Sequence, residues 1–170
     1  MTFLYYLAAI IAVFATFMVI TRSNVVHALL YMVVSLLSLA LVFFTLGAPF
    51  VAALEVIVYA GAIMVLFVFV IMMLNLGSQV SEQEQQWLQP RVWIGPAILS
   101  GILLIELFVV LGIGVGKTGS PGIVGPKQVG ITLFGPYVLG VELAAMLLLA
   151  GLVSAFHLGR RLDADEEGGS

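Results

Sequence analysis

The chain has 170 residues, of which 62% are hydrophobic and only 9% charged, and its mean hydropathy is +1.22. An average soluble domain carries about 25% charged residues, so this composition excludes an ordinary soluble globular protein and a disordered tail. The net charge of −3 provides no basic patch for nucleic acid. The absence of cysteine excludes disulfides, thiolate-held iron–sulfur clusters and cysteine-based zinc sites.

Five apolar stretches are long enough to cross a membrane, which takes about 20 mostly apolar residues. They run over about residues 3–20, 27–46, 50–76, 92–115 and 132–158. Lipid tolerates only helices or closed barrels, and runs of this length favour helices. We therefore predict an all-α integral membrane protein, with a single five-helix membrane domain over residues 1–158 and a polar cytoplasmic tail over 159–170.

The connections between these stretches predict their arrangement. Between the first three spans lie only TRSNVV and GAP, where Pro49 breaks the helix, and such short turns force antiparallel neighbours. The third connection is polar and leaves room for a short surface helix carrying Trp87. The fourth, residues 116–130, is rich in glycine and predicts an irregular loop. Pro96 and Pro136, in IGPAIL and FGPYVL, are placed in the first turns of the last two spans.

The positions of the basic residues predict the orientation in the membrane. With five spans the termini lie on opposite sides, and four arginines fall on the side of the C terminus against two lysines on the other. These are Arg22, Arg91, Arg160 and Arg161 against Lys117 and Lys127. The positive-inside rule therefore places the N terminus outside and the C terminus in the cytoplasm.

Three acidic residues, Glu55, Glu106 and Glu142, lie inside the apolar stretches, although no Lys or Arg lies inside any of them. A charged carboxylate in mid-membrane costs about 2.5–3.5 kcal/mol on insertion scales. Each acid is therefore protonated, paired across a subunit interface, or facing water. The structural alternative is a neutral acid hydrogen-bonded to backbone or hydroxyl. Counting residues from the helix ends places all three in the outer half of the bilayer or near its middle.

The third span is the most unusual. Glu55 and Tyr59, four residues apart, are expected on one helix face, which Ala52 and Ala62 extend. Gly61 lies between two alanines in mid-membrane, and glycine lowers the cost of a local change in helical winding. From the residues alone, a packing notch for a neighbouring helix is the favoured interpretation.

The second span carries a polar stripe made of His27, Tyr31, Ser35, Ser38 and Thr45. These side chains need partners, so we expect the stripe to face protein and to form hydrogen bonds between helices. Histidines at helix ends, His27 and His157, could ligate a b-type haem, but a haem needs deeper ligands, and capping is favoured. No phosphate loop, nucleophile triad or metal-ligand spacing is present, so we predict no catalytic residue and no metal on this chain.

Several segments resemble one known family. The stretch ALEVIVYAGAIMVLFVFVIMMLNL, from Ala53 to Leu76, is similar to the third transmembrane helix of subunit J of bacterial NADH–quinone oxidoreductase, respiratory complex I. NVVHALLYMVVSLL, WIGPAIL and VGITLFGPYVLGVELAAMLLLAGLVSAFHLGR also resemble that subunit, so the resemblance reaches to about Arg160.

The resemblance implies a five-helix subunit of the membrane arm, with subunits A, H, K and N and the lipid bilayer as partners. FMN, iron–sulfur clusters and quinone would be bound elsewhere in the complex and none by this chain. The family's third helix carries a π-bulge and rotates between α and π forms, which opens and closes a hydrated path from the quinone cavity to the charged residues of the arm.

The resemblance also assigns roles to residues. The helix switch falls on Tyr59, Ala60, Gly61 and Val65. The candidates for the proton path or coupling are Glu55 and Tyr59 on the same helix, together with Glu142. Glu142, within GVELA, also matches the family pattern, whereas Glu106 matches no family motif and is a weak candidate.

Together these observations predict a subunit of the bacterial inner membrane that couples quinone reduction to proton translocation and has no complete catalytic site of its own. The alternative is a stand-alone small transporter or a structural membrane scaffold. Transporters usually show internal repeats and broken helices at corresponding positions. The tripeptides IGP and FGP in the last two spans, which share only Gly-Pro, do not establish such a repeat.

Overall fold

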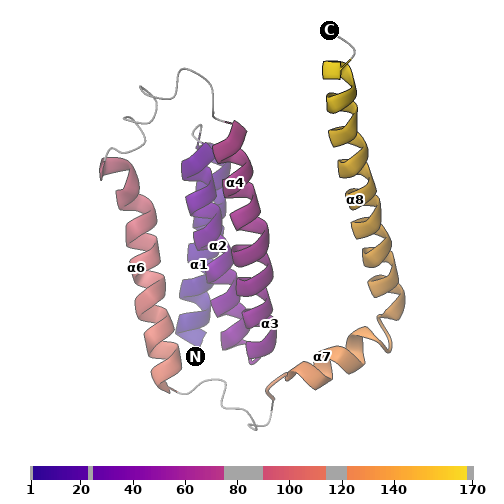
Figure 1. Cartoon of the computed structure of the whole chain (residues 1–170). Coiled ribbons are helices and arrows are strands. Elements are labelled where there is room, and N and C mark those ends of the chain that lie inside the picture. The colour runs from indigo at the N-terminus through magenta and orange to yellow at the C-terminus, as the bar shows by residue number, and fades with distance from the viewer. Residues whose placement is uncertain (1, 23–24, 75–89, 114–121, 168–170) are drawn as a thin grey trace. The chain divides into compact units, whose positions relative to one another are not determined.

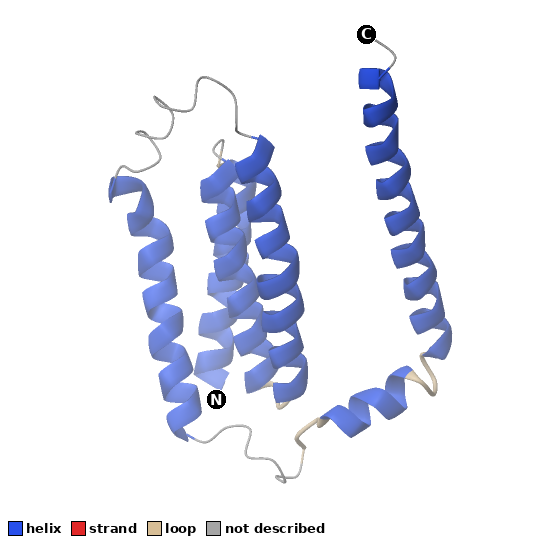
Figure 2. Ribbon diagram, viewed as in Figure 1, coloured by secondary structure: helices blue, strands red, loops and turns tan. Residues whose placement is uncertain are grey.

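The computed structural model of the chain describes residues 2–22, 25–74, 90–113 and 122–167, and every regular element within these ranges is a helix (Figures 1 and 2). Five helical stretches are long and apolar enough to cross a membrane: Thr2–Thr21, Val25–Thr45, Pro49–Met73, Trp93–Gly112 and Val138–Gly159. The prediction of an all-α protein with five candidate membrane spans is confirmed. The expected surface helix around Trp87 lies outside the described residues.

The chain divides into two units, residues 1–125 and 126–170. The first contains α1 (Thr2–Thr21), α2 (Val25–Thr45), α3 (Pro49–Leu54), η1 (Glu55–Ile63), α4 (Met64–Leu74) and α6 (Pro90–Ile113). In Figure 1, α3 and α4 follow one another in a single long helix, with η1 between them. Helix α2 is the centre of this unit, because α1, the third span and α6 all contact it. A single five-helix domain over residues 1–158 stays a prediction.

Small side chains bring α1 and α2 close together. Ala8 and Ala15 of α1 are completely buried, and they pack with Ile11 and with Val34 and Leu41 of α2. Without a hydrophobic driving force between helices in lipid, such small residues allow the close backbone approach that van der Waals packing requires.

Polar contacts cross this interface at Ser35. The hydroxyl groups of Thr16 and Ser35 are 2.8 Å apart, and the Ser35 hydroxyl donates to the Ala12 carbonyl at 3.2 Å. The expected hydrogen bonds between helices are therefore confirmed at Ser35. Ser38 and Thr45 differ, since each hydroxyl donates to a carbonyl of its own helix, at 2.7 and 2.9 Å. Serine and threonine hydroxyls can satisfy themselves in this way without a neighbouring helix.

A glycine closes α2 and turns the chain into the third span. Gly47 has φ of +85°, its N–H donates to Phe44, and the N–H of Ala48 donates to Phe43. These two bonds form the Schellman motif that ends many helices, with glycine in the left-handed position. Pro49 then takes the first position of α3, where a missing N–H costs nothing. Downstream of α6, the N–H of Val124 donates to the Gly47 carbonyl at 2.8 Å.

The second unit corrects two expectations. The segment expected as an irregular loop contains a helix, α7 (Pro126–Leu133), because Pro126 suits a first helical position and outweighs the neighbouring glycines. The fifth span, α8 (Val138–Glu167), begins after Pro136 and not before it. Pro136 lies in the turn over residues 134–137, where Tyr137 and Val138 donate to Thr132 and Gly135.

The fourth span also begins differently from the prediction. Helix α6 starts at Pro90, so Pro96 lies inside the helix and not in its first turn. The prediction was wrong because a second proline, at position 90, already occupies the helix start. An interior proline removes one backbone hydrogen bond.

Candidate functional site

The middle of the third span is wound as a π-helix, η1, from Glu55 to Ile63. At its start the N–H of Glu55 still bonds to the carbonyl of Val51, four residues back. At its end the N–H of Met64 bonds to the carbonyl of Tyr59, five residues back. Such i→i+5 winding is rare in proteins, and where it occurs it often lies at a functional site. The expected π-bulge is therefore confirmed, and it extends over nine residues.

The π winding separates two residues that the sequence places together. Glu55 is buried, at 7% exposure, whereas Tyr59 is 50% exposed. The expectation that they share a face assumed α-helical spacing, in which residues four apart are stacked. Along the actual helix the buried positions are Ala52, Glu55 and Met64, and between the last two the half-buried positions are Ala60 and Gly61, five and six residues after Glu55. The predicted continuation of the face to Ala62 is wrong for the same reason, since Ala62 is exposed.

Gly61 and Met64 hold the π segment in its present register. A methyl group added at Gly61 would lie 3.1 Å from the carbonyl oxygen of Val56, five residues back, which is tighter than ordinary van der Waals contact. Met64 is 1% exposed and is the buried end of the segment, while Val65 beside it is 64% exposed. Met64 is thus the buried side chain of α4 nearest to η1, and a change of winding in η1 would displace it.

The two buried acids of the first unit, Glu55 and Glu106, lie toward the same end of its described part. Glu55 comes six positions after Pro49, about 9 Å along the helix at 1.5 Å per residue. Glu106 is buried at 2% exposure and lies against the backbone of Ala8, near the beginning of α1. Glu55 and Glu106 were expected at similar depths, and their position toward one end of the unit agrees with this. Which side of the membrane that end faces stays a prediction. Glu142 belongs to the second unit, in the second turn of α8, and is exposed there.

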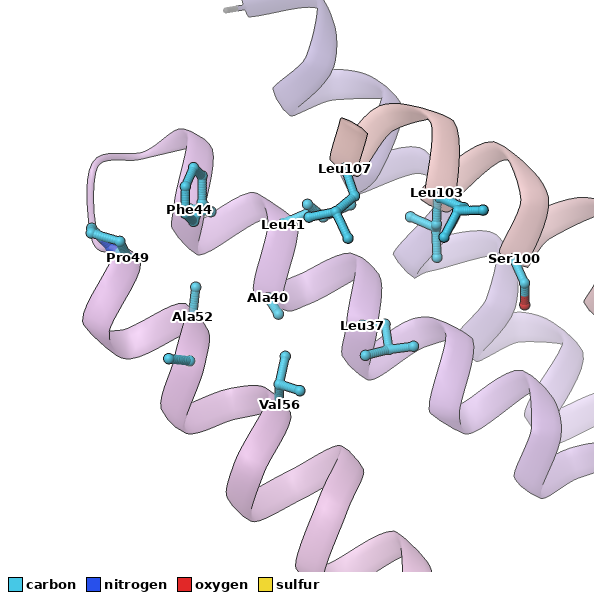
Figure 3. A pocket seen from close by; sticks show the side chains of 12 residues that line it. Leu37, Ala40, Leu41, Phe44, Pro49, Ala52, Val56, Ser100, Leu103 and Leu107 are labelled. Carbon is cyan, nitrogen blue, oxygen red and sulfur yellow. The ribbon is translucent and has the colours of Figure 1, made fainter. Parts of the chain in front are cut away.

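An apolar cleft lies between the helices that carry these two acids. Its volume is about 420 Å³, and it is bounded by α2, the start of the third span and α6 (Figure 3). The figure shows Ala52 and Val56 on one side and Leu103 and Leu107 on the other. Ser100 brings the one hydroxyl group of the lining. Neither carboxyl group opens into the cleft, so it offers hydrocarbon and not charge to whatever occupies it.

The described residues contain no group of three or more side chains that could hold a metal ion. His27 is buried in the first unit, and His157 is exposed on α8 in the second. The described part of the first unit therefore combines the π-helical segment η1 with an apolar cleft and with two buried acids, Glu55 and Glu106, on the helices that border this cleft.

Comparison with known proteins identifies the family. The family model of NADH-ubiquinone/plastoquinone oxidoreductase chain 6 matches residues 15–158. The NADH-quinone oxidoreductase subunit J of Escherichia coli K12 is 62% identical over 168 residues, which cover 98% of this chain and 90% of that protein. The chain belongs to the NADH-quinone oxidoreductase subunit J family. The subunit J of Pseudomonas aeruginosa PAO1 is 61% identical over 95% of this chain and 98% of its own length, and that of Buchnera aphidicola from Acyrthosiphon pisum is 49% identical over 98% of each.

Membership of the subunit J family agrees with the resemblance drawn from the motifs of the third and fifth spans. Two features of this subunit J chain were not predicted from its sequence. Met64, the enclosed end of the π segment, has no polar or small-residue signal, and the cleft depends on how α6 packs. The burial of Glu106 by α1 could have been anticipated only from its apolar neighbours Leu103 and Val110, at helical spacing of three and four.

Proposed function

We propose that the chain is a membrane-arm subunit of a proton-pumping NADH–quinone oxidoreductase and that its third span couples quinone reduction to proton translocation by changing its winding. The relatives carry the name NADH-quinone oxidoreductase subunit J and match the chain over nearly its whole length. The π segment over Glu55–Ile63 is the observation that carries the mechanism.

The geometry of a winding change defines what moves. Converting η1 to α winding removes the extra residue from the turn, and one residue corresponds to about 100° of helical rotation. The part of the helix beyond η1 then rotates relative to the part before it. Met64 would leave the interior, and Tyr59 and Val65 would change the neighbours they face. We assign the switch to Tyr59, Ala60, Gly61 and Val65.

Glu55 occupies the hinge of this movement. It is the first residue of η1, and its N–H still belongs to the α ladder. Rotation beyond it would exchange the apolar groups around its carboxyl without moving its own backbone. In this proposal Glu55 receives water or a subunit contact in one winding state, and Glu142 of α8 supplies a second group of the same proton path.

The remaining features of the proposal concern location and assembly. Most side chains of the third span are exposed within the first unit, and those of the fifth span are exposed within the second, so both require surroundings such as lipid or other subunits. We assign subunits A, H, K and N as neighbours in the bacterial inner membrane, with the N terminus periplasmic and the C terminus cytoplasmic. In this proposal FMN, iron–sulfur clusters and quinone are bound by other subunits. This chain contributes the winding change of its third span and the acids of the proton path.

The test uses Glu55→Gln and Gly61→Val in the assembled complex in inner-membrane vesicles, with protons pumped per NADH oxidised and turnover as readouts. Both variants are expected to lower one readout severalfold. Gly101→Val is the matched control, because nothing lies within 4 Å of a methyl group added there. Wild-type pumping and turnover in both variants would refute the coupling role.

Purification distinguishes the competing functions. A complex subunit is expected to leave the membrane in mild detergent together with other subunits of the oxidoreductase. A stand-alone transporter or scaffold would purify alone or as a homo-oligomer and keep its fold. That second result would exclude the proposed function even if the third span does change its winding.

A further inference from the structure

Glu106 is the most enclosed ionisable side chain among the described residues. It lies on the face of α6 formed by Leu103, Glu106 and Val110, whose exposed fractions are 5%, 2% and 0%. This face is turned toward α1, where the carboxyl group lies against the backbone of Ala8. Both carboxyl oxygens are sealed from solvent, and neither has a hydrogen-bond partner within the described part of the chain.

The helices that pack on α6 carry no charge that could pair with this carboxyl. Within α1 and α2 there is no Lys, Arg, Asp or Glu. Their titratable side chains are Tyr5 and Tyr6 on α1 and His27 and Tyr31 on α2. On α6 itself the other charged residue is Arg91, and at 1.5 Å per residue the fifteen positions between them correspond to about 22 Å.

His27 is also too far away to serve as a partner. The contact of Thr16 with Ser35 sets the register of the antiparallel pair α1 and α2. Ala8 precedes Thr16 by eight positions on α1, and His27 precedes Ser35 by eight positions on α2. Because the two helices are antiparallel, these steps lead toward opposite ends of the bundle. At 1.5 Å per residue the two levels are separated by about 24 Å along the bundle.

The chemistry that follows is that of a neutral acid. An isolated carboxylate without a partner is so unfavourable in an apolar interior that the group takes up a proton instead. Partner subunits cannot supply the missing base, because the side chain is enclosed by the chain's own helices. A structural acid of the usual kind would be hydrogen-bonded to backbone or hydroxyl. Glu106 has the backbone of Ala8 beside it, inside the hydrogen-bond ladder of α1, and neither carboxyl oxygen makes a hydrogen bond of normal geometry.

We propose that Glu106 is a proton-binding site in its own right, which holds its proton while α6 is packed on α1 and exchanges it when these two helices separate. Helix α6 contacts α1 at few positions, whereas α1 and α2 pack along most of their length. Separation at α6 is therefore the movement that least disturbs the unit. This site lies on a different span from the π segment and does not depend on the proposed function.

Infrared difference spectroscopy tests the proposal on the full chain, purified with the subunits that accompany it and placed in lipid nanodiscs at neutral pH. The wild type is expected to show a carbonyl band of a protonated carboxylic acid that Glu106→Gln lacks. Transfer to D2O is expected to shift that band while the protein stays folded. Glu142→Gln, whose acid is exposed within the second unit, is the matched control and is expected to keep the band.

The outcomes are decisive in each direction. Loss of carboxylate bands in Glu106→Gln, with no change in the protonated band, would show an ionised group and overturn the proposal. A protonated band that shifts in D2O only after unfolding would show a permanently sealed acid, which also overturns it. Glu106→Met serves as the second variant if Glu106→Gln does not fold, and circular dichroism confirms the fold of each.

Discussion

Replacing Glu106 by methionine is expected to stabilise the protein. Glu106 is 2% exposed, and its two carboxyl oxygens have no hydrogen-bond partner in the described structure. Burying such an unpaired polar group costs about 1–3 kcal/mol in protein mutational data. Methionine has similar length and no oxygen atoms, and it adapts to irregular space between apolar neighbours. The free energy of unfolding should therefore rise by about 1–3 kcal/mol.

The assay is the reversible unfolding of the full chain in mixed micelles, titrated with dodecyl sulfate and followed by circular dichroism. Glu106→Gln retains an unpaired polar group and is expected to unfold close to the wild type. Val110→Ala on the same buried face removes two methyl-sized groups from the packed interface and should lower the unfolding midpoint through lost van der Waals contact, which shows that the titration reports on this interface.

A loss of stability in Glu106→Met would refute the reasoning. It would mean that the carboxyl group makes a favourable hydrogen bond in the folded protein, because removing a satisfied buried group costs more than the apolar replacement returns. The same result would also weaken the case for a proton-binding site, since a satisfied acid needs no functional explanation. Gain of stability together with loss of the protonated band would support both.

Gly61→Ala brings a methyl group 3.1 Å from a backbone oxygen of the π segment, and we expect it to favour α winding by about 1 kcal/mol, seen as a changed register in a density map of the variant. Gly95→Ala would force the buried Tyr31 hydroxyl aside, so α6 should detach from α2 and the unfolding midpoint should fall. The Thr16→Ala and Ser35→Ala double-mutant cycle should give a coupling energy of about 0.6 kcal/mol in the unfolding titration.

The spans were predictable because length and apolarity decide them almost alone. A run of about 20 apolar residues has one stable form in lipid, whatever surrounds it. Proline positions were less reliable. Pro49 was placed correctly at a break, but Pro96 and Pro136 were assigned to helix starts that Pro90 and Val138 occupy. A proline marks a boundary only when no neighbouring residue fills that role better.

The sequence shows that acids lie inside the apolar spans, but it does not predict the environment of each carboxyl group. Glu55 and Glu106 were both expected to need a partner, water or a proton, and the sequence could not choose among these. The choice depends on which helix covers each residue. Ala8 of α1 is completely buried and lets the backbone approach α6, which leaves the Glu106 carboxyl sealed. That packing follows from the register of α1 against α2, set by contacts such as Thr16 with Ser35.

The winding of the third span depends still less on local sequence. Glycine at position 61 permits π geometry, but the enclosed residue at the end of the segment is Met64, whose side chain carries no sequence signal for π winding. Most side chains from Val56 to Val70 are exposed within this chain, so packing inside the first unit restrains only one side of the helix. Under the proposed function, the two windings differ by one backbone register and a few side-chain contacts, and the surfaces that cover the exposed side would select between them. A residue that strains one winding, as alanine at position 61 does, should therefore act most strongly where those covering surfaces are present, in the assembled complex.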